Sequence, residues 1–245
     1  MTIAADHSRT IDQNGYSIVS NVFDDVQVAS LLSQIEKGLQ RGTDGNIKSS
    51  RGETYAARNL AELNPDLLDS WTQPQLTELL SEVLGSEFGL VRILYFDKHP
   101  NRTWSLPWHK DMTIAVKDNS LPSTQFTKPT RKSGVDHVEA PDDVLQNMLT
   151  LRIHLDDVTD DNGPLEVAIG SHAQCKQATE HDHQVARILV QAGDVLAMRP
   201  LVSHASGSSS PGTTAHRRIL HLEFSSQTEL QDGFQWQLFH SPAKL

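Results

Sequence analysis

The sequence of 245 residues has a single cysteine, few aromatic residues and no long apolar run. Because Cys175 has no second cysteine to pair with, an intramolecular disulfide is excluded and nothing requires an oxidising compartment. No stretch approaches the roughly 18 consecutive apolar residues of a membrane-spanning helix. The N-terminus lacks the basic start and apolar core of a signal peptide. We therefore expect a soluble, cytoplasmic protein with no membrane partner.

Basic residues are outnumbered, since 21 Lys and Arg face 31 Asp and Glu and give a net charge of −10. Nucleic acids and anionic lipids are bound mainly through clustered Lys and Arg, so we expect no nucleic-acid partner. A local basic pocket for a small acid remains compatible with this balance. The length allows one domain over residues 1–245, and no internal repeat or boundary divides it.

Helical patterns lie near the N-terminus, and strand patterns dominate the rest of the chain. Residues 15–23 resemble a strand, and apolar residues then recur at helical spacing from Val28 to Leu39, ahead of Gly42. Further helices are predicted at 64–71 and 74–84. Strands separated by turn residues follow at 88–96, 148–155, 164–169, 194–198 and 219–224. This order predicts a mainly β fold with flanking helices, namely an antiparallel jelly roll whose N-terminal helices pack on one sheet.

One segment, residues 113–146, is rich in Lys, Ser, Thr and Pro and has weak periodicity. A loop of this length in a compact domain is usually functional or disordered. Two interpretations stay open, a lid over a site or a mobile insertion with no chemical role. Its basic residues could meet an acidic substrate or could be solvated; they include Lys128, Arg131 and Lys132.

The residues with the clearest chemistry are a His-x-Asp pair, His109 and Asp111, and a distant histidine, His204. On a β-strand, positions i and i+2 face the same side, so an imidazole and a carboxylate can converge. Two histidines and one carboxylate are the ligands that non-haem Fe(II) oxygenases use. Two arginines, Arg217 and Arg218, follow His204 and could hold an acidic cosubstrate beside the metal.

Other pairs with the same spacing compete with this interpretation. The pair at 154 and 156 runs into a polar turn, the pair at 137 and 139 lies in the lid-like segment, and the pair at 221 and 223 follows the arginines. Only His109 and Asp111 combine a strand with a downstream histidine and an arginine. A zinc hydrolase would accept the same ligands without needing that arginine, so a metallohydrolase remains an alternative.

The motifs together resemble the phytanoyl-CoA dioxygenase-like family of Fe(II)/2-oxoglutarate-dependent oxygenases. The matching runs are Trp108 to Asp111, Leu155 to Asp157, Asp161 to Leu165, Gly170 to His172, Gly193 to Val195, His204 to Ser206 and Arg217 to Phe224. The resemblance implies a cupin-like double-stranded β-helix. It also implies an enzyme that uses Fe(II), 2-oxoglutarate and O₂ to hydroxylate or otherwise oxidise a small molecule, with release of succinate and CO₂. A non-catalytic cupin-like binding protein is the other alternative.

The resemblance also assigns roles to residues. It implies that His109, Asp111 and His204 are the iron ligands. An arginine seven residues before an aromatic, here Arg217 before Phe224, would hold the distal carboxylate of 2-oxoglutarate, with the hydroxyl of Ser206 beside it.

Further expectations concern the pocket and the reaction. Arg218 is the alternative to Arg217, but the two face opposite sides of a strand, and Arg217 shares the face of the polar His221 and Glu223. Arg152 stands where the family often has an aromatic residue, so it is a possible pocket residue, as are Arg218 and Trp108. Related halogenating oxygenases lack the carboxylate ligand, so Asp111 indicates hydroxylation.

Overall fold

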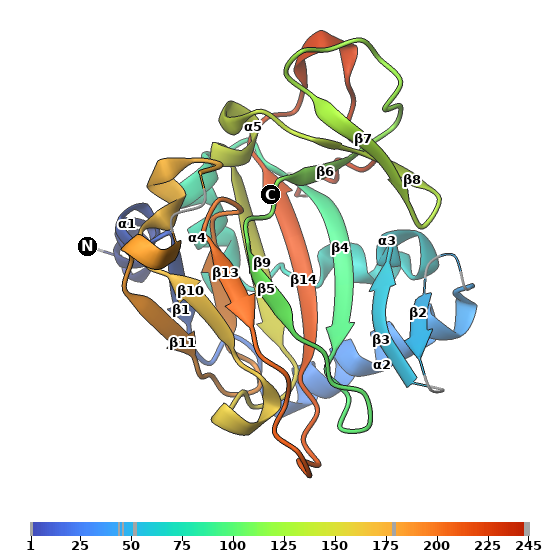
Figure 1. The fold of residues 1–245 in the computed structure, drawn as a ribbon, viewed down its shortest axis with the longest axis vertical. Helices are drawn as coiled ribbons and strands as arrows, with labels where there is room; N and C mark the ends of the chain where they lie inside the picture. Colours follow the sequence, from blue (N-terminus) through green and yellow to red (C-terminus); the bar gives the residue numbers. More distant parts are fainter. Residues whose placement is uncertain (1, 44, 46, 51–52, 178–179, 243–245) are drawn as a thin grey trace.

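The protein is represented by a computed structural model, which describes residues 2–43, 45, 47–50, 53–177 and 180–242. Within these residues the largest element is a seven-stranded antiparallel sheet with strand order β1-β12-β9-β14-β4-β3-β2 (Figure 1). Its strands are β1 (Tyr16–Val19), β2 (Ile47–Ser50), β3 (Glu53–Arg58), β4 (Gly89–Asp97), β9 (Met148–His154), β12 (Val195–Met198) and β14 (Arg218–Ser225). The strands predicted at 88–96, 148–155 and 219–224 are the central strands of this major sheet.

A second antiparallel sheet lies in front of the major sheet in Figure 1 and has the order β11-β10-β13-β5. Its strands are β5 (Leu106–His109), β10 (Leu165–Ala168), β11 (Val185–Ile188) and β13 (His204–Ser206). Two facing antiparallel sheets with long connections between them are the architecture of a jelly roll. The fold predicted from the sequence is therefore confirmed.

Helices cover the other face of the major sheet. They are α1 (Ile3–Asn14), α2 (Asp25–Arg41), α3 (Leu60–Leu63), the 3₁₀ helix η1 (Pro65–Asp69) and α4 (Pro74–Leu84). Helix α2 begins at a capping box, in which Asp24 accepts a hydrogen bond from the Gln27 N–H and Gln27 bonds back to the Asp24 N–H. The helix expected at 64–71 is only the short η1, because Pro65 starts a new turn directly after α3.

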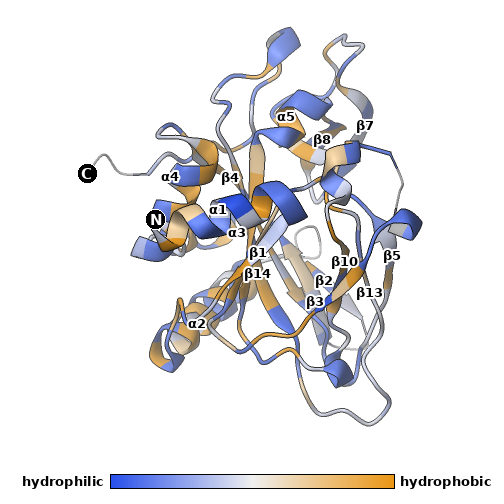
Figure 2. Cartoon of the chain, turned by 90° about the vertical axis from the view of Figure 1, so that its left-hand side faces the viewer, coloured by the Kyte–Doolittle hydropathy of each residue, from blue (hydrophilic) through white to orange (hydrophobic). Residues whose placement is uncertain are grey.

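The alternation of side chains along β9 and β14 separates the core from the interior of the jelly roll. Leu151 on β9 and Leu222 and Phe224 on β14 are fully buried in the cluster that packs against the helices. Their neighbours Arg152 and His221 therefore face the space between the two sheets. Figure 2 shows the hydrophobic strands of the sheets behind the largely hydrophilic helix α1. The polar positions on the inner face of the major sheet make a site rather than a core.

The segment 113–146, expected to be a loop, is a third antiparallel sheet. Its strands are β6 (Thr113–Val116), β7 (Thr127–Lys132) and β8 (Val135–Glu139), in the order β6-β8-β7, followed by the short helix α5 (Asp142–Gln146). Val116 and Val138 pack with Phe234 and Trp236 from the C-terminal part of the chain. The loop prediction was wrong because the residues that stabilise these strands lie about a hundred positions away. A role as a lid stays a prediction.

Among the described residues, no helix is both long and apolar enough to cross a membrane.

Candidate active site

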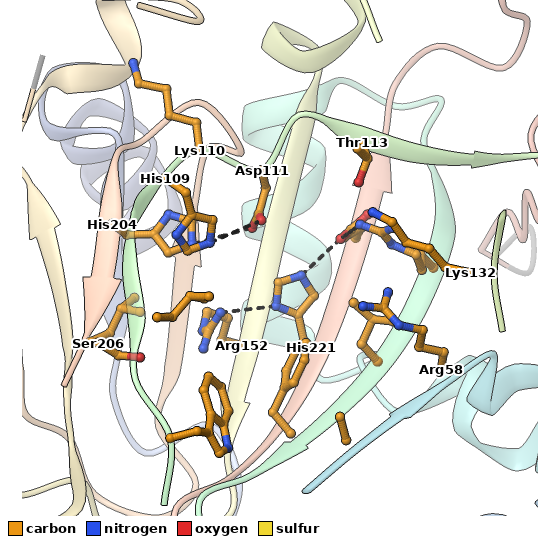
Figure 3. Close-up of a pocket in the computed structure, with 18 of the residues that line it drawn as sticks. Arg58, His109, Lys110, Asp111, Thr113, Lys132, Arg152, His204, Ser206 and His221 are labelled. Atoms are coloured by element: carbon orange, nitrogen blue, oxygen red, sulfur yellow. Dashed lines mark hydrogen bonds and ion pairs between the residues drawn. The ribbon is translucent and has the colours of Figure 1, made fainter. Parts of the chain in front are cut away.

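Three side chains from separate parts of the chain meet at one end of the cavity between the sheets. His109 on β5 and His204 on β13 are direct partners across the two strands, and their ring centroids are 4.2 Å apart. The Asp111 carboxylate oxygens lie 3.8 Å from Nε2 of His109 and 3.7 Å from Nε2 of His204 (Figure 3). In the described part of the chain this is the one group of three such residues whose ligand atoms all lie within 4.8 Å of one another. The arrangement can hold a metal ion.

Both imidazoles are oriented by their own backbone. The Nδ1 atom of His109 is 2.8 Å from the carbonyl oxygen of Pro107, and that of His204 is 2.9 Å from the carbonyl oxygen of Val202. A carbonyl only accepts hydrogen bonds, so Nδ1 carries the proton in each ring and donates it. This leaves both Nε2 lone pairs directed toward Asp111, which is the tautomer and orientation that metal binding requires.

The charge states of the triad also suit a cation. Burial opposes ionisation of Asp111, but the nearby imidazoles of His204, His221 and His109 and the guanidinium of Arg92 hold its pKa at about 2. Burial lowers the pKa of His204 to about 4. At neutral pH the site therefore presents a carboxylate and at least one neutral imidazole, the forms that bind metals.

The backbone that positions Asp111 differs from the one predicted from the sequence. The His-x-Asp spacing predicts two residues on one strand face, but β5 ends at His109. The N–H of Asp111 instead donates to the carbonyl oxygen of Pro200 at 2.9 Å, four residues before His204. The segment that precedes the second histidine therefore positions the carboxylate between both imidazoles.

The competing pairs have other partners. The pair at 137 and 139, expected in a lid-like loop, lies on strand β8, and Glu139 forms an ion pair with Lys128 at 2.7 Å, so its carboxylate is already paired. His221 donates from Nε2 to Glu223 at 3.1 Å, and Glu223 also pairs with Arg92. On the other side of the ring, Arg152 lies 3.3 Å from Nδ1 of His221. These four residues form a continuous chain across the floor of the cavity.

Buried cations lie at the end of the cavity next to His204. Lys98 is fully buried, and its Nζ donates to Ser206 Oγ at 3.0 Å and to the carbonyl oxygen of Gly163 at 3.2 Å. Arg217 is 2 % exposed and donates from Nη1 to the same carbonyl oxygen at 2.6 Å, while its buried Nε has no partner. Arg152 is also buried, with an unpartnered Nε. Within the described residues, no carboxylate forms an ion pair with any of these three cations.

Lys98 is the residue at this end that the sequence analysis missed. Its N–H and carbonyl pair with those of Arg217, so the two residues are direct partners one position beyond the paired ends of β4 and β14. Burial and the charges of Arg217 and Arg152 lower the pKa of Lys98 to about 6. The signal was the alternation Leu94, Phe96, Lys98, which continues the inner face of β4 beyond the predicted end of the strand. At neutral pH Lys98 is therefore largely uncharged beside Arg217, and an anion bound at this end of the cavity would favour its protonated form.

Two predicted pocket residues lie elsewhere. Arg218 forms a bidentate ion pair with Asp156, at 2.9 Å from Nε and 2.6 Å from Nη2, and does not line the cavity. Trp108 is half-exposed and does not line it either. The pairing of β5 with β13 contains a β-bulge, so simple alternation does not hold on β5, and Leu106 and His109 both reach the cavity.

The cavity has a volume of about 630 Å³, so it has room for more than one small molecule. Its walls combine the triad, Arg152 and Arg217 with apolar and aromatic side chains, among them Leu94, Phe96, Trp104, Leu106, Met112 and Leu165.

A jelly roll with two histidines and one carboxylate at its mouth is typical of cupin-like metal-dependent oxygenases. The phytanoyl-CoA dioxygenase (PhyH) family matches this chain over residues 11–218, and the chain belongs to that family. The resemblance drawn from the sequence motifs is confirmed.

Known proteins agree with this assignment. The chain is 22 % identical over 189 residues to the ectoine dioxygenase of Bordetella bronchiseptica, covering 74 % of this chain and 54 % of that protein. It is 28 % identical over 181 residues to the L-proline trans-4-hydroxylase of Streptomyces griseoviridis, covering 61 % of this chain and 58 % of the relative. The chain thus spans little more than half the length of these curated relatives.

Solved structures support the fold. The structure of EctD from S. alaskensis with bound Fe superimposes with a TM-score of 0.68 at 18 % identity, covering 91 % of this chain and 76 % of that one. The α-ketoglutarate-dependent carbocyclase SnoK from nogalamycin biosynthesis gives a TM-score of 0.66 at 18 % identity, covering 95 % and 89 %.

Proposed function

We propose that this protein is an Fe(II)- and 2-oxoglutarate-dependent dioxygenase that oxidises a small molecule. The observation that carries the proposal is the position of the His109, Asp111 and His204 triad beside two buried arginines, Arg152 and Arg217, that have no carboxylate of their own. A divalent metal needs the first group and a dicarboxylate cosubstrate needs the second. The named activities of the relatives, ectoine dioxygenase and L-proline trans-4-hydroxylase, are of the same kind.

The residues of the cavity fit both the metal ion and the cosubstrate. His109 and His204 would bind iron through Nε2 and Asp111 through a carboxylate oxygen, leaving other coordination positions open. Arg217 would hold the distal carboxylate of 2-oxoglutarate with its free Nε–H, together with Lys98 and Ser206. When bound, iron and 2-oxoglutarate would supply oxidation by O₂ coupled to release of succinate and CO₂. The protein's part is to orient the ligands, neutralise the cosubstrate and keep the reacting groups away from bulk water.

Two other functions are less well supported. A zinc hydrolase would use the same triad but has no need of Arg217, whose burial without a carboxylate partner is unfavourable unless an anion binds. A non-catalytic cupin-like binding protein would not need to keep both Nε2 atoms and a carboxylate directed at one point. Activity with Zn(II) in the absence of O₂ would support the hydrolase.

The test of the function is a screen for coupled turnover. The protein is incubated with Fe(II), 2-oxoglutarate and O₂, and small organic acids and amino acids are added in pools while succinate is measured. We expect at least one pool to raise succinate formation well above the uncoupled rate and to lose a component to an oxidised product. Absence of 2-oxoglutarate binding, measured by calorimetry with Mn(II), would contradict the proposal.

The retained carboxylate predicts the type of oxidation. Halide would have to occupy the coordination position that Asp111 fills, so the wild-type protein should form hydroxylated or desaturated products and no chlorinated ones. The reaction is run in chloride buffer, and products are searched for the chlorine isotope pattern by mass spectrometry. A chlorinated product from the wild type would refute this prediction.

A further inference from the structure

The cavity contains a second cationic end, formed by Arg58 on β3 and Lys132 on β7. Both line the cavity, and Figure 3 shows them together on the side of Asp111 away from His109 and His204. Within the described residues, neither side chain has a hydrogen bond or an ion pair. Burial, reinforced by the charge of Arg92, lowers the pKa of Arg58, and burial together with the charges of Arg58 and Arg92 lowers that of Lys132. Two half-buried cations beside each other are unfavourable without an anion.

The protein's own carboxylates do not supply this anion. Three cations gather here, Arg58, Arg92 and Lys132, and the acidic groups that act on Arg58 and Lys132 are Glu223 and Asp111. Glu223 is already bonded to Arg92 and His221, and Asp111 belongs to the proposed metal site. The chain has a net charge of −10, so this local excess of positive charge runs against its overall composition. Cations kept together in a cleft without partners mark a binding site for an anion.

Two other basic residues of the hairpin formed by β7 and β8 differ from Lys132, because they have carboxylate partners. Lys128 pairs with Glu139 at 2.7 Å, and Arg131 pairs with Asp136 at 3.1 Å. Both are exposed, whereas Lys132 lies against the cavity. The hairpin tip is held over β3 by a hydrogen bond from Asn59 to the Ser133 carbonyl oxygen at 3.1 Å. This contact, next in the chain to Arg58, places Lys132 beside it.

The cosubstrate cannot supply the anion either. Arg58 pairs with Leu94 and Leu94 with His221, so Arg58 lies two strands, about 10 Å, from His221 across the sheet. Arg217 lies four residues, about 13 Å, from His221 along β14. The direction across the strands is nearly perpendicular to the direction along β14, so the Cα atoms of Arg58 and Arg217 are about 16 Å apart. A five-carbon cosubstrate held at Arg217 does not reach Arg58.

We infer that Arg58 and Lys132 bind the anionic group of the primary substrate, which is therefore a small organic acid bearing a carboxylate or phosphate. This inference rests on the proposed function and extends it to the substrate class. The acid group is held at one end of the cavity. The apolar part of the substrate lies along Leu94 and Phe96, toward the triad. The anion thereby sets which carbon is presented for oxidation.

The experiment uses a matched set of probes of one chain length: octanoate, octyl phosphate and neutral octanamide. Calorimetry is done on protein saturated with Mn(II) and 2-oxoglutarate, so that the cosubstrate end is filled and no turnover occurs. We expect wild-type protein to bind at least one of the two acids about tenfold or more tightly than octanamide, which is the effect of one charge-assisted hydrogen bond. In the double variant Arg58→Gln/Lys132→Gln this preference should be lost.

The control is Lys128→Gln/Arg131→Gln, which removes the same amount of positive charge from β7, the strand that carries Lys132, but changes side chains that are already paired. It should keep the preference for the acid. Equal affinity of wild type for acids and amide, or a preference that survives in Arg58→Gln/Lys132→Gln, would overturn the inference. A preference lost in Arg217→Gln instead would also overturn it, by placing the acid at the cosubstrate end. Failure of 2-oxoglutarate itself to bind is a separate result that counts against the proposed function.

Thermal melting distinguishes a purely structural role of Arg58 and Lys132 from a role in substrate binding. Removing like charges that have no partners should leave the melting temperature of the Arg58→Gln/Lys132→Gln variant unchanged or raised. A lower melting temperature with an intact preference for acids would assign the two residues to folding and overturn the inference.

Discussion

Replacing Asp111 by alanine should abolish iron binding and turnover while the fold is retained. The carboxylate lies between two imidazoles whose Nε2 atoms are 3.8 and 3.7 Å from it, and it makes no contact that the hydrophobic clusters need. Loss of a residue that only supports a metal ligand typically lowers metal affinity by about 10- to 100-fold, so loss of a ligand should exceed that. His109→Ala and His204→Ala should behave alike. Iron content after purification, Mn(II) affinity and succinate release are the measurements.

The control for this prediction is His154→Ala. His154 is buried on β9 with no partner for its Nδ1, and burial holds its pKa at about 3. It belongs to a competing His-x-Asp pair but lies outside the cavity lining. Its loss should lower stability by leaving a cavity and should leave iron affinity nearly unchanged. Full turnover in any of the three triad variants would refute the ligand assignment. Loss of iron in His154→Ala would instead assign the metal to the competing pair.

Replacing Arg217 by alanine should raise the KM for 2-oxoglutarate about tenfold or more, with a smaller effect on iron binding. Each charge-assisted hydrogen bond contributes roughly 1.5–3 kcal/mol, and 1.4 kcal/mol corresponds to a factor of about ten. Arg217→Lys should not restore the affinity fully, because an ammonium group lacks the planar fork of a guanidinium. Lys98 remains in the Arg217 variants and should preserve some binding. Calorimetry with Mn(II) gives the affinity without turnover.

The matched control is the neighbouring Arg218→Ala. This variant breaks the bidentate ion pair with Asp156 and should lower the melting temperature, yet leave 2-oxoglutarate affinity nearly unchanged. If Arg218→Ala damages affinity and Arg217→Ala does not, the cosubstrate lies on the other face of β14. If neither changes affinity, Arg152 becomes the next candidate for the carboxylate.

Local sequence patterns were sufficient to predict much of the major sheet. The run from Ile219 to Phe224 alternates apolar and polar residues, and the buried positions Leu220, Leu222 and Phe224 pack on the helices as the alternation predicts. Arg217 therefore falls on the inner face and Arg218 on the outer one. Helices α2 and α4 were predictable for a similar reason, since their start signals, the N-cap Asp24 and Pro74 in the first turn, lie directly beside the periodic residues.

The strands of the segment 113–146 could not be predicted in this way. Strand β7 contains five basic or polar residues and a proline, and its stability comes from pairing with β8. The sheet to which both belong packs against the C-terminal residues Phe234 and Trp236. Periodicity within a window says nothing about a partner a hundred residues away, so a strand with little apolar character is mistaken for a loop.

For the site, the sequence by itself determined which residue types are available, namely a His-x-Asp pair and a second histidine, and it determined the inward face of Arg217. Only the tertiary structure decided which of them meet. The Asp111 backbone bonds to Pro200, Lys98 pairs with Arg217, and the hairpin tip brings Lys132 to Arg58. The reason is physical. Side-chain direction follows from local backbone geometry, whereas contacts between distant segments depend on strand register and packing, which no short stretch of sequence encodes.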